Sequence, residues 1–376
     1  MAEPRNIVLI IGNGFDLDLG LKTSYKDFWE SDFCPKNYPA PIIKHLGEKW
    51  PEKLESVKWY DLENELLNYY KGIEKSRRIP DVIDVDERKF LKAFNPEVSA
   101  SGYYSEFNHQ IESLFQKELI DTNPLCPTYL KIPMRDDLLL SSVVRDYKAL
   151  ELIKDGLIKY LNSQNDASLN ENAIATSVLY AITESINSGN SIKIYDFNYT
   201  QLPYGYNGRF KENIHYVHGT TMTGKIIIGT KDYEGYNESF DFLQKSFDPN
   251  FNPPAVVYDL LAADDVIIFG HSLGVNDSQY FKAFFKRQSS PESPVKKNIT
   301  VFTKDTASEL ALKRSLQQMT DTNLSSLFGL NTIKVYRTDE LYRKPVLFKE
   351  FLERYISDTR HVVPIIQQLD ECRIGH

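Results

Sequence analysis

The chain has few cysteines and no long apolar run. Its three cysteines (Cys34, Cys126 and Cys372) are widely spaced and form no Cys-x-x-Cys pair, so neither a zinc site nor a disulfide framework is indicated. No apolar run approaches the roughly 18 to 20 residues that span a bilayer. The run Ile7–Ile11 is also too short for the apolar part of a signal peptide. We therefore expect a cytoplasmic protein without a membrane span or a metal site.

Positive charge is also scarce. The 376 residues include 44 Lys and Arg against 52 Asp and Glu, which gives a formal net charge of -8. Such a chain is not attracted to nucleic acid phosphates or to anionic membranes, so the sequence carries no strong nucleic-acid signal. With 41% hydrophobic residues, the composition is that of an ordinary globular protein. The length suits two domains or one enlarged domain.

Apolar runs of strand length predict the sheet. Asn6–Gly12 is a continuous apolar run that ends at a glycine, as in a strand buried on both faces. A helix is expected to start near Thr23 or Ser24, because either side chain can cap it. Further strands are expected at Ile192–Phe197, Ile214–Val217, Lys225–Gly229, Asp265–Gly270, Asn298–Thr303 and Thr332–Tyr336.

Helical patterns separate the later strands. They cover Ala255–Ala263, Ser278–Lys286, Thr306–Met319 and Pro345–Ser357. Strands that alternate with helices favour an α/β fold with a doubly wound, mostly parallel sheet.

Residues 39–190 have a different pattern, in which strand signals are scarce. Apolar residues recur every three or four positions within Asp61–Tyr70, Tyr104–Leu119 and Leu138–Leu161, while Asp121–Met134 is an irregular, proline-containing stretch. We expect a large helical insertion here, after the first strand and helix. The α/β domain would then comprise residues 1–38 and 191–376.

Polar turns follow four of the predicted strands, and ligands of open α/β sheets bind beyond the carboxyl ends of the strands. The first turn is Gly12-Asn13-Gly14-Phe15-Asp16. Its glycines would let backbone N–H groups approach a phosphate or a ribose. A tight strand-to-helix turn would explain the same pattern.

Two further turns carry an amide and an imidazole. Asn198 and Thr200 follow the strand that ends at Phe197, where they could orient a sugar hydroxyl or a water, or form an Asx-type turn. His218 and Gly219 follow the next strand. The intrinsic pKa of histidine suits a general base, although a packed or capping histidine is equally consistent with this position.

The fourth turn, Gly270-His271-Ser272-Leu273-Gly274, matches the G-x-S-x-G nucleophile elbow of serine hydrolases. Asn276 and Asp277 then lead into a helix. A catalytic triad on Ser272 would need Asp305 with His361 or His376. His361 follows a predicted helix rather than a strand, which is not the usual setting for the histidine of such a triad.

The segment Ile11–Phe28 contains Gly-Asn-Gly-Phe-Asp, a Gly-Leu-x-Thr-x-Tyr step and an Asp-Phe pair. It resembles the N-terminal signature of the AbiH family of bacteriophage abortive infection proteins. Later segments resemble further landmarks of that family: Trp59–Glu63, Phe197–Thr200, Val217–Gly219 and Gly270–Asp277. The resemblance implies a role in defence against phage.

The same series of turns is distantly similar to sirtuin-type NAD-binding domains, whose phage-defence relatives hydrolyse NAD. This similarity implies a Rossmann-like core in which Gly12 and Gly14 face the pyrophosphate. It also implies that Asn198 positions the reacting ribose or water, that His218 is the base and that Ser272 contacts a phosphate or the adenosine ribose. The zinc-binding cysteines of protein-deacylating sirtuins are missing, so we do not expect protein deacylation.

The resemblance therefore implies Asn198 and His218 as catalytic residues and NAD as substrate or ligand, with no permanently bound cofactor. The expected nucleotide contacts are Gly12, Asn13, Gly14, Phe15, Asp16, Thr200, Gly219, Gly270, His271, Ser272 and Asp277. Expected partners are a phage-derived trigger and a second copy of the chain. Two alternatives stay open: a nonenzymatic nucleotide sensor and a serine hydrolase that uses Ser272.

Overall fold

The computed structural model describes residues 3–54, 61–76, 135–164, 169–203, 205–233, 237–292 and 295–372. The chain folds as two units, each formed from segments that are distant in the sequence. The sheet unit comprises residues 1–24, 161–226 and 252–376, and the helical unit comprises residues 25–160 and 227–251. The domain boundaries predicted from sequence differ from these and stay predictions.

Six parallel strands form the centre of the sheet unit. They are β1 (Asn6–Ile11), β2 (Ser191–Asp196), β3 (Ile214–Tyr216), β6 (Asp265–Phe269), β7 (Asn298–Thr303) and β8 (Thr332–Arg337). Their order in the sheet is β3-β2-β1-β6-β7-β8. Along the chain, β2 and β3 are added on one side of β1. The chain then crosses to the other side of β1, where β6, β7 and β8 follow in order. The predicted α/β class is confirmed.

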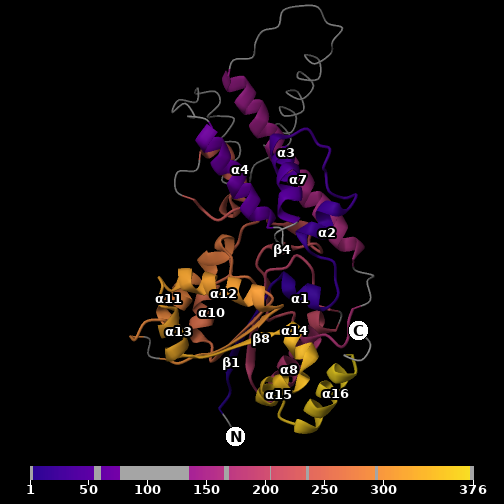
Figure 1. Cartoon of the computed structure of the whole chain (residues 1–376), viewed down its shortest axis with the longest axis vertical. Helices are drawn as coiled ribbons and strands as arrows, with labels where there is room; N and C mark the ends of the chain where they lie inside the picture. The colour runs from indigo at the N-terminus through magenta and orange to yellow at the C-terminus, as the bar shows by residue number, and fades with distance from the viewer. Residues whose placement is uncertain are drawn as a thin grey trace, which may run out of the picture. The chain divides into compact units, whose positions relative to one another are not determined.

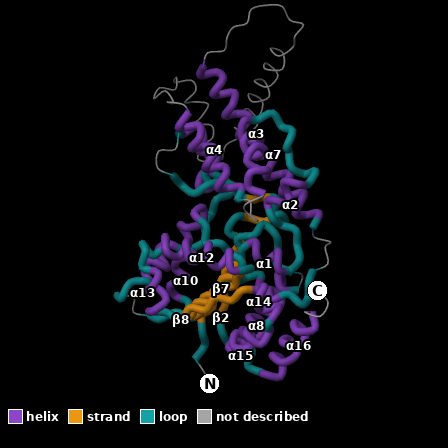
Figure 2. Tube along the Cα trace, viewed as in Figure 1, coloured by secondary structure: helices purple, strands orange, loops and turns teal. Residues whose placement is uncertain are grey.

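Helices cover both faces of this sheet (Figures 1 and 2). Alternate β1 side chains enter different cores: Ile7, Leu9 and Ile11 belong to one, and Val8 and Ile10 to the other. This alternation explains why the whole strand is apolar, since neither face meets water.

The first core lies against α8 (Ile174–Asn187), α14 (Thr338–Arg343), η4 (Pro345–Phe348), α15 (Lys349–Tyr355) and α16 (Val362–Cys372). The second lies against α10 (Val256–Ala262), η3 (Val275–Tyr280), α11 (Lys282–Gln288), α12 (Thr306–Met319) and α13 (Leu324–Leu330). The short helices α9 (Tyr206–Phe210) and η5 (Thr359–His361) complete the unit.

Several predicted elements needed correction. The segment 225–229 was expected to be one strand, but only Lys225–Ile226 (β5) is extended, and it pairs antiparallel with β4 (Gly219–Thr220) outside the main sheet. The chain reverses within 221–224, and a parallel pairing would need a crossover of about a dozen residues. The helices expected at 278–286 and 345–357 are each split into a short 3₁₀ turn and an α-helix.

Another helix was not expected from the sequence. Helix α1 (Asn13–Asp18) begins directly after Gly12, so the polar turn predicted there is itself helical. The expected helix start near residues 23 and 24 is confirmed, because α2 (Tyr25–Glu30) begins at the next residue.

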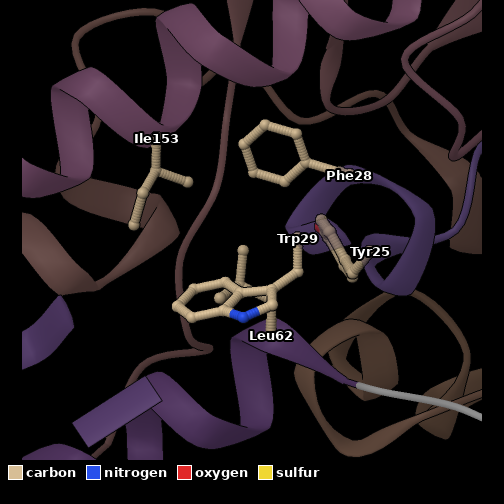
Figure 3. A pocket seen from close by; sticks show the side chains of 5 residues that line it. All are labelled: Tyr25, Phe28, Trp29, Leu62 and Ile153. Atoms are coloured by element: carbon tan, nitrogen blue, oxygen red, sulfur yellow. The ribbon is translucent and has the colours of Figure 1, made fainter. Parts of the chain in front are cut away.

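The helical unit contains α2, α3 (Pro41–Leu54), α4 (Leu62–Ser76), most of α7 (Arg135–Ser163), η1 (Glu238–Leu243) and η2 (Lys245–Phe247). Five side chains from α2, α4 and α7 line a small apolar pocket in this unit: Tyr25, Phe28, Trp29, Leu62 and Ile153 (Figure 3). The helix and loop predicted at 104–119 and 121–134 lie outside the described residues. Among the helices that the structure describes, none is long and apolar enough to span a membrane.

Candidate functional site at the carboxyl edge of the sheet

Two glycines after β1 fit closely against the turn that follows β6. The N–H of Gly12 donates to the carbonyl of Phe269, and the N–H of Gly14 donates to that of Gly270, each at 3.0 Å. A Cβ on Gly12 would lie 2.6 Å from Cα of His271, and a Cβ on Gly14 would lie 2.6 Å from Cα of Gly270. Neither position has room for a side chain. Both glycines therefore serve this junction of main chains, which brings the ends of β1 and β6 together.

The first turn of α1 places Asp16 inside the protein, where its side chain is 4% exposed. One carboxylate oxygen accepts from the Asn198 amide at 3.0 Å, and the other accepts from the Thr200 hydroxyl at 2.5 Å. The Asn198 amide also donates to the carbonyl of Gly12 at 3.3 Å. Four of the residues singled out from sequence are thus joined in one hydrogen-bonded group, although 182 residues separate Asp16 from Asn198.

A second buried carboxylate, Asp196, lies beside this group at the end of β2. It is 2% exposed and accepts the backbone N–H of Asn198 at 2.9 Å. Burial raises the pKa of Asp16 to about 6, against the opposing effect of hydrogen bonds from Thr200, Thr23 and Asn198. Burial and then the charge of Asp16 raise the pKa of Asp196 well above its usual range. The two acids therefore favour a form in which one of them is protonated.

A second group forms around Asp277, from η3. Nε2 of His218 lies 2.9 Å from one oxygen of this carboxylate, and Nε2 of His271 lies 3.5 Å from the other. Nδ1 of His271 accepts the backbone N–H of Leu273 at 3.0 Å. Both imidazoles are buried, so a single carboxylate is placed between two histidines that follow different strands.

Phe197 connects the two groups. Its ring centroid lies 5.4 Å from that of His218 and 4.4 Å from that of His271, and both contacts are edge-to-face. Because Asn198 follows directly, the end of β2 contributes to both groups. The carboxyl ends of β1, β2, β3 and β6 thus all contribute residues to this edge of the sheet.

A model of the family described as "Bacteriophage abortive infection AbiH" matches residues 8–298. This match covers more than half of the chain. The chain belongs to the AbiH family. Family membership implies a role in phage abortive infection, and the matched region contains every candidate site residue described above. No curated protein and no solved structure matches the chain.

The remaining predicted contacts of this AbiH protein occupy different environments. Phe15 is a core residue whose ring meets Phe269 edge-to-face at 5.3 Å. Asn13 accepts a hydrogen bond from the Thr23 hydroxyl at 2.6 Å. Gly219 has a φ of +77°, and a Cβ there would lie 2.0 Å from the carbonyl oxygen of Lys225, so the β4–β5 hairpin requires glycine. Ser272 is exposed to solvent.

Among the described residues, the two triad partners considered for Ser272, Asp305 and His361, make other contacts. Asp305 caps α12 by accepting the N–H of Ser308 at 2.9 Å, and His361 of η5 contacts the Tyr180 hydroxyl at 3.0 Å. His376 lies outside the described residues. The left-handed backbone of the turn falls on Gly270 and Leu273, with φ of +65° and +51°, rather than on Ser272. The AbiH turn thus shares the sequence pattern of an elbow, while Asp305 and His361 each make other contacts.

Two acids of the site region were missed from sequence. Asp196 was included in an apolar strand, where its polarity at the strand end was the available signal. Asp18 accepts the N–H of Ala175 at 2.8 Å and the Tyr342 hydroxyl at 3.0 Å. It thereby binds the N-terminus of α8, where a negative charge is favourable. Asp18 anchors α1, which carries Asp16.

Proposed function

We propose that this AbiH protein is an abortive infection effector that binds a nucleotide at the carboxyl edge of its sheet and hydrolyses NAD at the nicotinamide–ribose bond. The hydrogen bond between His218 and Asp277 carries the proposal, because it prepares a histidine as a base at the sheet edge that also holds Asn198 and Asp16.

The topology supports a nucleotide site. Numbered along the chain, the six strands have the order 3-2-1-4-5-6, which is that of Rossmann-type dinucleotide-binding folds. In such sheets the ligand binds where the chain changes direction, which here is between β1 and β6. The Gly12–His271 junction lies at this point. We place the pyrophosphate beside the exposed Ser272, away from the buried carboxylates.

The electrostatics of the site suit the cleavage of this bond. Nicotinamide leaves as a neutral molecule, so no general acid is needed, while positive charge develops on the ribose. A carboxylate beside the reacting carbon stabilises such a centre, as it does in glycoside hydrolysis. Asp16 would supply that charge, and Asn198, which is bound to it, would orient the ribose or the attacking water.

The proton balance places His218 as the base. A carboxylate only accepts hydrogen bonds, so Nε2 of His218 bears the proton directed at Asp277, and Nδ1 is the basic nitrogen of the neutral ring. Water attacks C1′ of the ribose, the C1′–N bond breaks, and its electron pair neutralises the pyridinium. Nδ1 of His218 accepts the proton that the water loses. The products are ADP-ribose and nicotinamide.

One observation favours a nonenzymatic sensor as the second candidate. Asn198, Thr200 and Asp16 hydrogen-bond to one another, as they would in a network that only holds the fold. A sensor would use the same edge to bind a nucleotide without turnover. Protection against phage that survives His218→Ala would favour this reading.

Nicotinamide release by the purified full-length chain tests the proposal, with and without lysate of phage-infected cells. We expect Asn198→Ala and His218→Ala each to lower the release rate by roughly 100-fold or more. His361→Ala is the matched control, because this histidine lies on η5 and contacts Tyr180 instead. Equal release by the wild type and His218→Ala would refute the assigned base. No release in either condition, with no NAD-dependent rise in Tm, would refute NAD as the ligand.

A further inference from the structure

The orientation of His271 is fixed by its own loop. A backbone N–H can only donate, so Nδ1 of His271, 3.0 Å from the N–H of Leu273, must be the acceptor. The neutral ring then carries its proton on Nε2. Because His271 is buried and Leu273 has a left-handed φ of +51°, the loop shape and the ring orientation depend on each other.

Nε2 of His271 lies near the Asp277 oxygen that His218 does not use. The separation is 3.5 Å, an electrostatic contact, whereas His218 makes the shorter hydrogen bond of 2.9 Å to the other oxygen. The negative charge of Asp277 is thus opposed from two sides. An imidazole N–H dipole directed at a carboxylate weakens the attraction of that carboxylate for a proton on a neighbouring base.

We infer that His271, expected from sequence to contact the nucleotide, is a positioning residue that acts on the proposed base through Asp277. It holds the Asp277 carboxylate toward His218 and moderates the charge that His218 experiences. His218 is thereby kept in the tautomer with a basic Nδ1. The meaning of this basicity rests on the proposed function, whereas the contacts among His218, Asp277 and His271 do not depend on NAD.

The surroundings of the two histidines come from three elements. Among the described residues, Asp277 and Tyr280 of η3 are titratable side chains that face His218, and the Tyr280 ring lies 6.2 Å from it. Phe197 at the end of β2 meets both imidazoles. Phe281, between η3 and α11, meets His271 at 5.1 Å. Asp277 is therefore the charged group through which a change at residue 271 reaches His218.

Two substitutions separate the roles of the His271 ring. In His271→Asn, the side-chain oxygen replaces Nδ1 as the acceptor for Leu273, but the shorter side chain offers Asp277 no N–H in place of Nε2. In His271→Gln, the longer amide places a donor near the position of Nε2. We expect His271→Asn to increase the negative charge that His218 experiences from Asp277, and His271→Gln to preserve the contact with Asp277.

The test is an NMR pH titration of the histidine ring signals in the full-length chain labelled with ¹³C-histidine. There are seven histidines, and loss of one signal in His218→Gln assigns the ring of interest. We expect the His218 midpoint to rise by up to about 1 pH unit in His271→Asn, to fall by about 1 unit in Asp277→Asn, and to stay near the wild-type value in His271→Gln. The acid limb of the pH profile for nicotinamide release should move in the same directions.

An unchanged His218 midpoint in His271→Asn would overturn the inference, and so would equal shifts in His271→Asn and His271→Gln. If His271→Asn fails to fold, His271→Gln and Asp277→Asn are compared with the wild type instead. A shift of the His218 midpoint in His271→Gln as large as that in Asp277→Asn would also overturn the inference. The titration needs no NAD. Expected midpoints without any nicotinamide release would contradict the proposed function and leave the role of His271 standing.

Discussion

Gly14 and Gly270 meet main chain to main chain. The N–H of Gly14 donates to the carbonyl of Gly270 at 3.0 Å, and a Cβ on Gly14 would lie 2.6 Å from Cα of Gly270. Close packing at the junction of β1 and β6 is therefore sufficient to explain the glycine at position 14 of the family signature.

Gly14→Ala is expected to destabilise the protein, because backbone atoms rather than flexible side chains would have to move. We expect a loss of roughly 2 kcal/mol or more in the free energy of unfolding, measured by denaturant titration. Gly329→Ala in α13 is the matched control, since nothing lies within 4 Å of its added Cβ. That change should be neutral or stabilise by up to about 1 kcal/mol. Equal stability of the two variants would contradict the junction.

Acid pH should favour the folded state through Asp16. Burial raises the pKa of this carboxyl to about 6, whereas an unfolded chain has a value of about 3.9. The folded protein thus holds the proton more tightly, and its stability from this group is present at low pH and lost as the pH rises through about 6. Between pH 7.5 and 4.5, the wild type should gain on the order of 2 kcal/mol relative to Asp16→Asn, measured as the free energy of unfolding.

Asp358→Asn provides the control of opposite sign for this pH dependence. Hydrogen bonds from Arg360 lower the pKa of Asp358 to about 2, so its contribution is lost as the pH falls. Relative to this variant, the wild type should lose stability on acidification. A difference between the wild type and Asp16→Asn that is independent of pH would contradict the assigned burial.

In the helical unit, the ion pair of Lys245 with Glu63 should be more important for stability than a surface pair. Lys245 is 1% exposed and its ammonium lies 2.9 Å from the Glu63 carboxylate. Lys245→Met would leave a buried carboxylate without this partner, at a cost of about 3 kcal/mol. Lys286→Met removes the exposed pair with Asp321 and should cost less than about 1 kcal/mol. Thermal unfolding of both variants checks this, and similar losses would argue against a buried pair.

The central strands and most flanking helices of the sheet unit could be predicted from the sequence, because continuous apolar runs are characteristic of strands covered on both faces. Helix α1 was missed because Gly12 at its N-cap makes no side-chain cap and Gly14 lowers helix propensity. Packing at the glycine junction holds this six-residue helix. Segment 225–229 was misread as one full strand because strand propensity does not specify a pairing partner, and the nearest partner was a two-residue hairpin arm.

The candidate site was only partly predictable for a related reason. The rule that ligands bind beyond the carboxyl ends of strands identified Asn198, His218 and Asp277. It could not show that His218 and Asp277 form a hydrogen bond, since 59 residues separate them. The rule also could not show that Asp16 and Asp196 lie close together. That proximity depends on the register of β1 and β2, which the sequence pattern does not specify.

The most direct test of the account is protection of cells by Asp277→Asn, measured as the efficiency of plating of phages that the wild-type chain restricts. This substitution removes the charge between His218 and His271 while keeping the size of the side chain. Asp321→Asn is the matched control, because that acid lies on the surface beside Lys286. The account predicts that Asp277→Asn folds with a near-wild-type Tm yet gives no protection, whereas Asp321→Asn protects fully. Full protection by folded Asp277→Asn would contradict a functional site at this edge of the sheet.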